Sequence, residues 1–126
     1  MRIMNKWATI TGSSNGIGAA LAETFARNGY SIILHGRNEN DLLDMKKKIT
    51  FYGRETSIVN GDIRIPGTLQ DLVEHSRQKN IELFVNNVGY RCPGVSLENL
   101  TDTQIDEMFA VNCTIPIKLT RDIYKH

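Results

Sequence analysis

The residues best suited to binding a charged ligand lie in a glycine-rich turn near the amino terminus. Residues 11–18 read Thr-Gly-Ser-Ser-Asn-Gly-Ile-Gly and separate an apolar segment from an amphipathic one. Glycine has no Cβ, so such a turn bends tightly and approaches a pyrophosphate closely, and a following helix offers free N–H groups to the phosphates. Because no Gly-Lys-Ser/Thr is present, the turn is not a P-loop. It indicates a dinucleotide site, and a purely structural turn is the alternative.

Other polar side chains follow apolar segments further along the chain. Asp62 comes after one such segment, and Asn86 and Asn87 follow another. The carboxyl ends of parallel strands meet at one edge of a sheet, and open α/β sheets bind ligands there. These residues are therefore candidates for ligand binding. Structural roles are the alternative: Asp62 could cap the helix expected near Pro66, and the two amides could tie neighbouring loops together.

The stretch 34–38, which reads Leu-His-Gly-Arg-Asn, bears on the choice of cofactor. A site selective for NAD usually has a carboxylate here to hold the ribose 2′-hydroxyl, and none precedes Arg37. A guanidinium pairs with a 2′-phosphate in a bidentate way, which favours NADP. Glu39 is close enough to accept from the ribose, which would favour NAD, and Arg37 could also be an ordinary surface residue. We expect NADP, with NAD the weaker alternative.

Apolar runs that alternate with amphipathic stretches predict a βαβ series with a parallel sheet. Strands are expected at residues 7–10, 31–34, 57–60 and 81–85, and helices at 17–28, at 40–52, from 66 and from 101. Gly29 and Gly53 are expected to end the first two helices. Thr101 and Gln104 match a capping box, and Pro116 should kink the last helix.

Spacings of three and four residues give each predicted helix one apolar face. The residues expected to face inward, helix by helix, are Ile17, Ala20, Leu21, Thr24 and Phe25; Leu42, Leu43 and Ile49; Leu69, Leu72 and Val73; and Ile105, Met108, Phe109, Asn112, Pro116, Leu119 and Ile123. Asn112 is the polar member of the last set, and a buried amide without a partner costs about 1–3 kcal/mol. It should therefore meet either backbone freed by Pro116 or a polar site.

The composition is that of one ordinary globular domain. Of 126 residues, 40% are hydrophobic and 23% are charged, and the net charge is +1. This balance favours neither nucleic acid nor an acidic membrane as a partner, and no apolar run approaches the roughly 20 residues that span a bilayer. No secretory leader is visible. The cysteines (Cys92 and Cys113) and histidines (His35, His75 and His126) lack metal-ligand spacing, so we expect a cytoplasmic protein with reduced thiols and no metal.

Four motifs together resemble those of the short-chain dehydrogenases/reductases, in their compact one-domain branch. The motifs are Thr11-Gly12-x-x-x-Gly16-x-Gly18; Gly61-Asp62-Ile63; Asn86-Asn87-Val88-Gly89, in which the family usually has Ala at Val88; and Phe109-Ala110-Val111-Asn112. They occur in the family's order and at its spacing. The resemblance covers essentially the whole chain but only the first half of a usual member. One departure is Asn15, where many NADP-preferring members have a basic residue.

The resemblance implies one NAD(P)-binding domain over residues 1–126, with a Rossmann-type doubly wound α/β sheet in the strand order 3-2-1-4. It implies an NADP-dependent oxidoreductase that transfers hydride between the cofactor and a carbonyl or alcohol. Asp62 would lie against the adenine ring, and Asn112 matches the Asn of the family's catalytic tetrad. The cofactor-binding residues implied are Gly12, Ser13, Ser14, Asn15, Gly16, Ile17, Gly18, Arg37, Asn38, Asp62, Ile63, Asn86, Asn87 and Gly89.

The family's catalytic Tyr, with a Lys four residues later, does not occur in this sequence. The chain is therefore expected to lack the tuned general acid and the substrate pocket, and to need the missing half in cis or from another chain. A non-catalytic dinucleotide-binding module and an inactive gene remnant are the alternatives. A sheet that stops at its fourth strand would also expose an apolar edge, which predicts self-association.

Overall fold

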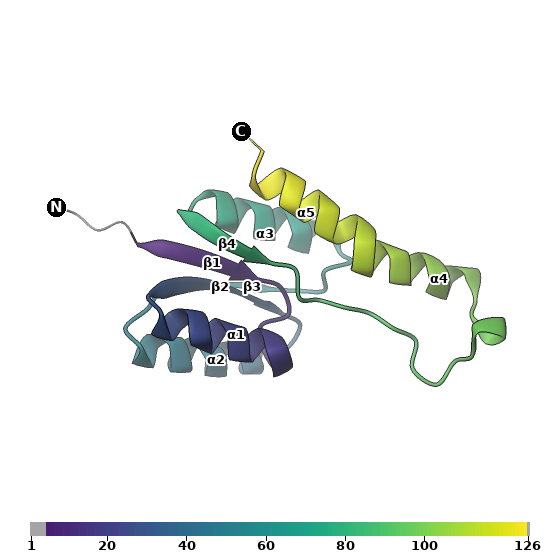
Figure 1. The fold of residues 1–126 in the computed structure, drawn as a ribbon, viewed down its shortest axis with the longest axis horizontal. Helices are drawn as coiled ribbons and strands as arrows, with labels where there is room; N and C mark the ends of the chain where they lie inside the picture. Colours follow the sequence, from purple (N-terminus) through teal and green to yellow (C-terminus); the bar gives the residue numbers. More distant parts are fainter. Residues whose placement is uncertain (1–4, 126) are drawn as a thin grey trace.

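The computed structural model describes residues 5–125, so the expectation for His126 lies outside the described residues. Four parallel strands form one sheet in the order β3-β2-β1-β4, with helices on both faces (Figure 1). This arrangement confirms the predicted doubly wound α/β fold and its strand order. The elements are β1 (Lys6–Ile10), α1 (Gly16–Arg27), β2 (Tyr30–Gly36), α2 (Glu39–Phe51), β3 (Thr56–Asn60), α3 (Pro66–Arg77), β4 (Ile81–Val85), η1 (Leu97–Asn99), α4 (Asp102–Phe109), η2 (Ala110–Thr114) and α5 (Ile115–Ile123).

The side chains of each strand alternate between the two faces of the sheet, and each face has its own core. Ile32 and Leu34 of β2 pack in one core with residues of α1 and α2. Ile33 lies between them in sequence and packs in the other core, with residues of α3 and α5. All three side chains are fully buried. A strand covered on both faces needs apolar side chains on both of them, as the run at residues 32–34 provides in β2.

Signals that act over a few residues predicted the helix ends well. Gly29 and Gly53, just after α1 and α2, adopt the positive φ angles of 92° and 73° that glycine tolerates at a helix end. Pro66 is the first residue of α3, where its missing N–H needs no partner. The Thr101 hydroxyl accepts from the N–H of Gln104, whose side chain accepts from the N–H of Thr101, so the capping box is confirmed.

The predicted inward faces of α1 and α2 are partly wrong, whereas that of α3 is right. In α1 the exposed residues include Ile17, Ala20 and Thr24, whereas the buried ones are Gly18, Ala22 and Ala26. In α2, Leu43 is exposed and Met45 is buried. In α3, Leu72 is buried, and Leu69 and Val73 pack beside it. Apolar residues occur on more than one side of α1 and α2. Periodicity alone does not decide which of two overlapping faces meets the sheet.

The last helix differs most from its prediction. Between α4 and α5 the backbone forms a π-helical turn, η2, and the helix continues through Pro116 as a nearly unbroken rod (Figure 1). Pro116 lies in the first turn of α5, directly after the π turn η2. The expected kink at Pro116 is therefore absent, and the π turn accommodates the proline instead. A π turn adds a residue and so changes the phase of the helix. As a result Val111 and Ile115 are buried, whereas Phe109 is 67% exposed and Asn112 is exposed.

The topology brings the loops that follow β1, β2 and β3 and the segment that follows β4 to one edge of the sheet (Figure 1). After β4 an extended segment runs away from the sheet and returns as α4. None of the helices among residues 5–125 has the length and apolar character needed to cross a membrane.

Candidate functional site

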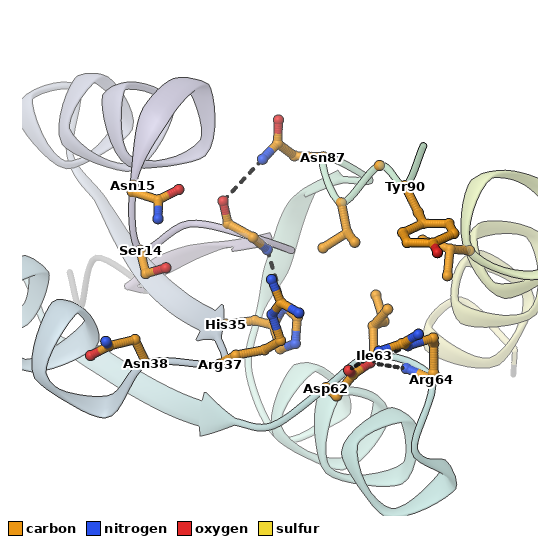
Figure 2. Close-up of a pocket in the computed structure, with 15 residues that line it drawn as sticks. Ser14, Asn15, His35, Arg37, Asn38, Asp62, Ile63, Arg64, Asn87 and Tyr90 are labelled. Carbon is orange, nitrogen blue, oxygen red and sulfur yellow. Dashed lines mark hydrogen bonds and ion pairs between the residues drawn. The ribbon is translucent and has the colours of Figure 1, made fainter. Parts of the chain in front are cut away.

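A cavity of about 680 Å³ opens at this edge of the sheet (Figure 2). Small-molecule and cofactor sites commonly have volumes of about 300–1,000 Å³, so the cavity is large enough for such a ligand. Five segments that are far apart in the sequence line it: Gly12, Ser14 and Asn15; His35, Gly36, Arg37 and Asn38; Asp62, Ile63 and Arg64; Asn87, Val88, Gly89 and Tyr90; and Val111.

The structure brings most of the predicted cofactor residues together in this lining. Those present are Gly12, Ser14, Asn15, Arg37, Asn38, Asp62, Ile63, Asn87 and Gly89; those outside it are Ser13, Gly16, Ile17, Gly18 and Asn86, together with Asn112. Sequence reasoning missed His35, Gly36, Arg64, Val88, Tyr90 and Val111. Each missed residue lies within two positions of a predicted one, so proximity along the chain was the available signal.

The glycine turn is fastened to the segment that follows β4. Thr11 Oγ1 accepts hydrogen bonds from the backbone N–H groups of Asn87, at 2.9 Å, and Val88, at 3.2 Å. In return, Asn87 Nδ2 donates to the carbonyl oxygen of Gly12 at 3.0 Å (Figure 2). Asn87 therefore ties two loops together while it also lines the cavity.

The N-terminus of α1 adjoins the cavity through Asn15, its N-cap residue. The Asn15 side chain makes no capping hydrogen bond, and within the described chain the first turn of α1 carries no acidic side chain. The first amides of a helix have no partners within it and carry a partial positive charge, which favours an anion such as a phosphate. Gly16, Ile17 and Gly18 begin this helix, although none of the three lines the cavity.

Two of the predicted cofactor residues also have structural roles. Ser13 is fully buried, and its Oγ accepts from the backbone N–H of His35 at 3.0 Å. Asn38 Oδ1 accepts from the N–H of Asp41 at 3.1 Å and so caps α2. Arg37 differs from both, because its side chain is exposed and has no hydrogen-bond or ion-pair partner among residues 5–125. Glu39, the possible ribose acceptor, does not line the cavity.

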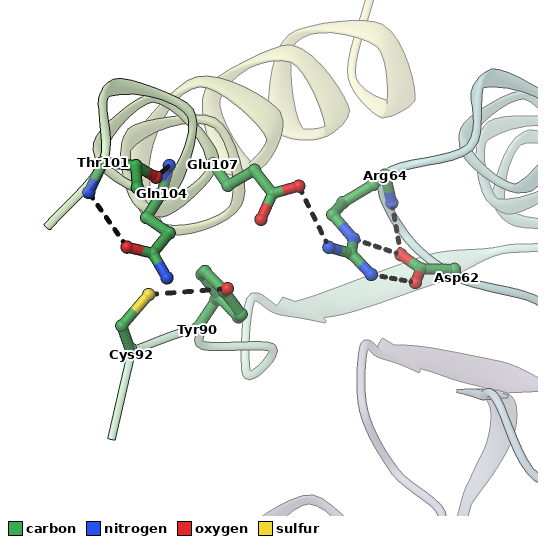
Figure 3. Close-up of polar contacts among 7 residues, drawn as sticks. All are labelled: Asp62, Arg64, Tyr90, Cys92, Thr101, Gln104 and Glu107. Atoms are coloured by element: carbon green, nitrogen blue, oxygen red, sulfur yellow. Dashed lines mark hydrogen bonds and ion pairs between the residues drawn. The ribbon is translucent and has the colours of Figure 1, made fainter. Parts of the chain in front are cut away.

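Asp62 and Arg64 form a two-point ion pair at the wall of the cavity (Figure 3). Arg64 Nε donates to Oδ1 at 3.1 Å, Nη2 donates to Oδ2 at 2.8 Å, and the backbone N–H of Arg64 donates to Oδ1 at 2.9 Å. These hydrogen bonds outweigh the effect of burial and lower the pKa of Asp62 to about 2. Asp62 is therefore ionised at ordinary pH. It does not cap α3, whose N-cap is Ile65.

Arg64 also connects this wall to α4 (Figure 3). Its Nη1 lies 3.4 Å from Glu107 Oε1, and its guanidinium lies 5.9 Å from the centroid of the Tyr90 ring. The ion pair with Glu107 is more than a third exposed on both sides, so its contribution to stability is small. The Tyr90 hydroxyl accepts from Cys92 Sγ at 3.5 Å. The proximity of Cys92, followed by burial, raises the pKa of Tyr90 to about 12, so Tyr90 keeps its proton at neutral pH.

Two predicted asparagines make their contacts outside the cavity. Asn86 Nδ2 donates to Thr120 Oγ1 on α5 at 3.1 Å. Asn112 pairs with the backbone of Tyr90 at both ends of its amide: Oδ1 accepts from the N–H and Nδ2 donates to the carbonyl oxygen, each at 2.7 Å. Asn112 is thus an exposed residue whose partner follows β4, and not a buried one that meets backbone freed by Pro116.

The chain matches a protein-family model described as short chain dehydrogenase over residues 6–126. An uncharacterised oxidoreductase of Staphylococcus saprophyticus is 31% identical over 134 residues, which cover 96% of this chain and 56% of the relative. Among solved structures, a short-chain dehydrogenase from Burkholderia cenocepacia in complex with NADP has a TM-score of 0.88 at 27% identity, covering 100% of this chain and 52% of that one.

A second solved structure is that of L-sorbose reductase from Gluconobacter frateurii, complexed with NADPH and L-sorbose. Its TM-score is 0.86 at 29% identity, and the match covers 97% of this chain and 47% of the reductase. The chain spans about half the length of the curated relatives it matches.

Proposed function

The chain belongs to the short-chain dehydrogenase family, and we propose that its cavity binds NADP(H) for hydride transfer between this cofactor and a carbonyl or alcohol. In this proposal residues 1–126 act as one dinucleotide-binding domain. The observation that carries it is the cavity, which the glycine turn, Arg37 and the Asp62 loop line together (Figure 2). The presence of NADP or NADPH in two structurally similar family members supports the same cofactor here.

The residues present suit the parts of a phosphorylated dinucleotide. Phosphates suit the free amides at the start of α1, and the 2′-phosphate suits the Arg37 guanidinium, which has no partner in residues 5–125. Ile63 and Val88 offer apolar surface to the adenine base of the dinucleotide. The Asp62 carboxylate lies beside them, and both of its oxygens accept hydrogen bonds from Arg64. The proposed contacts from side chains or backbone are Gly12, Ser14, Asn15, Gly16, Ile17, Gly18, Arg37, Asn38, Asp62, Ile63, Asn87 and Gly89.

The chemistry divides between the cofactor and the protein. Bound NADPH supplies a hydride and NADP⁺ accepts one, so the residues of this chain have to bind and orient the dinucleotide. The printed sequence has no Tyr followed four residues later by Lys, and we propose that the general acid is supplied in cis or by another chain. In this proposal Asn112 acts indirectly, because its amide bonds both the backbone N–H and the carbonyl oxygen of Tyr90 and so positions Tyr90 at the cavity. Residues 1–126 alone are expected to bind the cofactor without turnover.

Changing Arg37 to alanine tests the choice of cofactor. The Arg37→Ala variant should bind NADPH about 10- to 100-fold more weakly, because it loses charge-assisted hydrogen bonds to the 2′-phosphate. Its affinity for NADH, which lacks that phosphate, should change little. Titration calorimetry with both cofactors measures the two affinities.

Arg121→Ala is the matched control, because it removes the same charge from an exposed side chain whose one partner among residues 5–125 is the adjacent Asp122. It should leave both affinities unchanged. An equal loss of NADPH and NADH affinity in Arg37→Ala would contradict the assignment of the 2′-phosphate. Failure of the wild-type chain to bind either cofactor would contradict the proposed function itself.

We also propose that copies of the chain associate along the unpaired side of β4, the outermost strand of the sheet, which is not the edge at which the cavity opens. Within residues 5–125 no strand pairs with this edge. The strand carries Ile81, Leu83, Phe84 and Val85, all of them only partly buried, and Glu82 as its single charge. An unpaired apolar strand is a template for pairing with a second one.

This association predicts an average mass that rises with protein concentration in sedimentation equilibrium. Amide exchange in β4 should slow at the same time, because pairing protects the free N–H groups. The amides of α2, which lie far from this edge, serve as the internal control. A monomer at high concentration with unprotected β4 amides would argue against the proposal.

A further inference from the structure

The buried imidazole of His35 connects two walls of the cavity that are far apart in the sequence. Its Nδ1 lies 3.0 Å from the backbone nitrogen of Gly12, in the glycine turn (Figure 2). Its Nε2 lies 2.9 Å from the carbonyl oxygen of Gly61, beside Asp62. The ring bridges partners 23 and 26 residues away, and only 2% of the residue is exposed.

The two partners determine the protonation state of the ring. A backbone N–H only donates, so Nδ1 must accept from Gly12; a carbonyl oxygen only accepts, so Nε2 must carry the hydrogen that Gly61 receives. Both bonds are made only by the neutral imidazole protonated at Nε2. A second proton would sit on Nδ1 and face the Gly12 N–H, which leaves two donors opposed in a buried space.

The two backbone partners of the His35 ring, Gly12 and Gly61, are hydrogen-bonded in turn to other residues at the cavity. The carbonyl oxygen of Gly12 accepts from Asn87, so both polar backbone atoms of Gly12 are held, one by His35 and one by Asn87. The N–H of Gly61 donates to the carbonyl oxygen of Gly36, next to Arg37. The His35 ring therefore links the glycine turn to the Asp62 loop, in addition to the hydrogen bonds of Ser13 with the His35 backbone and of Gly61 with Gly36.

We propose that His35 is a positioning residue of the dinucleotide cavity, which holds these two walls in place only as the neutral Nε2–H imidazole and releases them when it gains a proton. The inference rests on the proposed function for its effect on ligand binding. Its effect on the Gly12 backbone does not depend on any ligand.

The surroundings of His35 favour the neutral ring. Burial lowers the pKa of His35 below its usual value near 6.5, and the positive charge of Arg37 lowers it further, while the hydrogen bond to Gly61 and the negative charge of Asp62 oppose this. The residues that face the ring from the glycine turn do not titrate. The pKa of His35 is lower in the folded chain than in the unfolded chain. The contribution of His35 to the stability of the fold is therefore complete above the unfolded-state pKa near 6.5, and it is lost as the pH falls through the folded-state pKa.

The test compares NADP⁺ affinity between pH 5 and 8 for the full chain and its His35→Asn variant, by calorimetry. The Asn side chain can still accept from Gly12 but does not titrate. Wild-type affinity should fall about tenfold more than that of His35→Asn between neutral and acidic pH, because only the wild type loses the Gly12 bond. The 2′-phosphate titrates near pH 6 in both experiments, so its own effect cancels in the comparison.

His75→Asn is the matched control. His75 is half-buried and pairs with Ser57, away from the cavity, so its removal should leave the wild-type pH profile unchanged. The inference is wrong if His35→Asn keeps the wild-type profile, or if wild-type affinity rises relative to that variant in acid, as an imidazolium that attracts phosphate would produce.

Amide exchange at Gly12, followed by NMR without ligand, tests the same inference if the variant does not fold. After correction for the intrinsic effect of pH, protection of the Gly12 amide should fall in acid while that of central β2 amides persists. Constant protection would overturn the role of His35. Loss of protection together with no NADP⁺ binding at any pH would support the role of His35 and refute the proposed function.

Discussion

Replacing Gly18 with alanine is expected to abolish measurable dinucleotide binding and to lower the free energy of unfolding by about 3 kcal/mol. A Cβ at this position would overlap the carbonyl oxygen of Gly12 and would lie 2.6 Å from Asn87 Nδ2. Those two atoms form the hydrogen bond that joins the glycine turn to the segment after β4. The methyl group must therefore break this bond or displace the turn, and either change moves the amides that would bind phosphate.

Gly67→Ala is the control for this substitution. Gly67 lies in the first turn of α3, and a Cβ there would have no atom within 4 Å. Because alanine favours helix more than glycine does, this variant should be unchanged or up to about 1 kcal/mol more stable. Chemical denaturation measures both stabilities and calorimetry measures cofactor affinity. A Gly18→Ala protein that binds cofactor as tightly as Gly67→Ala does would falsify the close approach described for this turn.

Thr11→Val should lower the free energy of unfolding by about 2–4 kcal/mol, although the two side chains have nearly the same shape. Thr11 is 1% exposed, and its hydroxyl is the acceptor for the N–H groups of both Asn87 and Val88. Valine leaves these two amides without that acceptor. We expect faster amide exchange at both positions and weaker cofactor binding, because the segment after β4 loses its attachment to the glycine turn.

The same substitution at Thr24 provides the comparison. Thr24 is exposed on α1, and its hydroxyl donates to the carbonyl oxygen of Ala20 one turn earlier, with no other partner in the described part of the chain. Thr24→Val should change the free energy of unfolding by no more than about 0.5 kcal/mol. Equal effects of the two substitutions in urea denaturation would show that the Thr11 hydroxyl does not hold this segment.

The sequence by itself determined several helix ends and which loops meet at the site. Gly29, Gly53, Pro66 and the Thr101 capping box act within a few residues, so their effects are readable without a partner. The alternating apolar and amphipathic segments, with the family resemblance, predicted the strand order. A parallel sheet then places the residues after each strand at a common edge, which is why most of the predicted cofactor residues line one cavity.

Only the tertiary structure decided which helix face is covered and what each polar side chain binds. Ile17 and Phe109 belong to apolar patterns, yet both are exposed. The sheet covers another side of α1, where Ala22 and Ala26 are buried, and α4 buries none of its residues. The partners of His35 and Asn112 lie 22 to 26 residues away and are set by strand order and by the π turn. A local pattern carries no information on such contacts, since each depends on how separate elements pack.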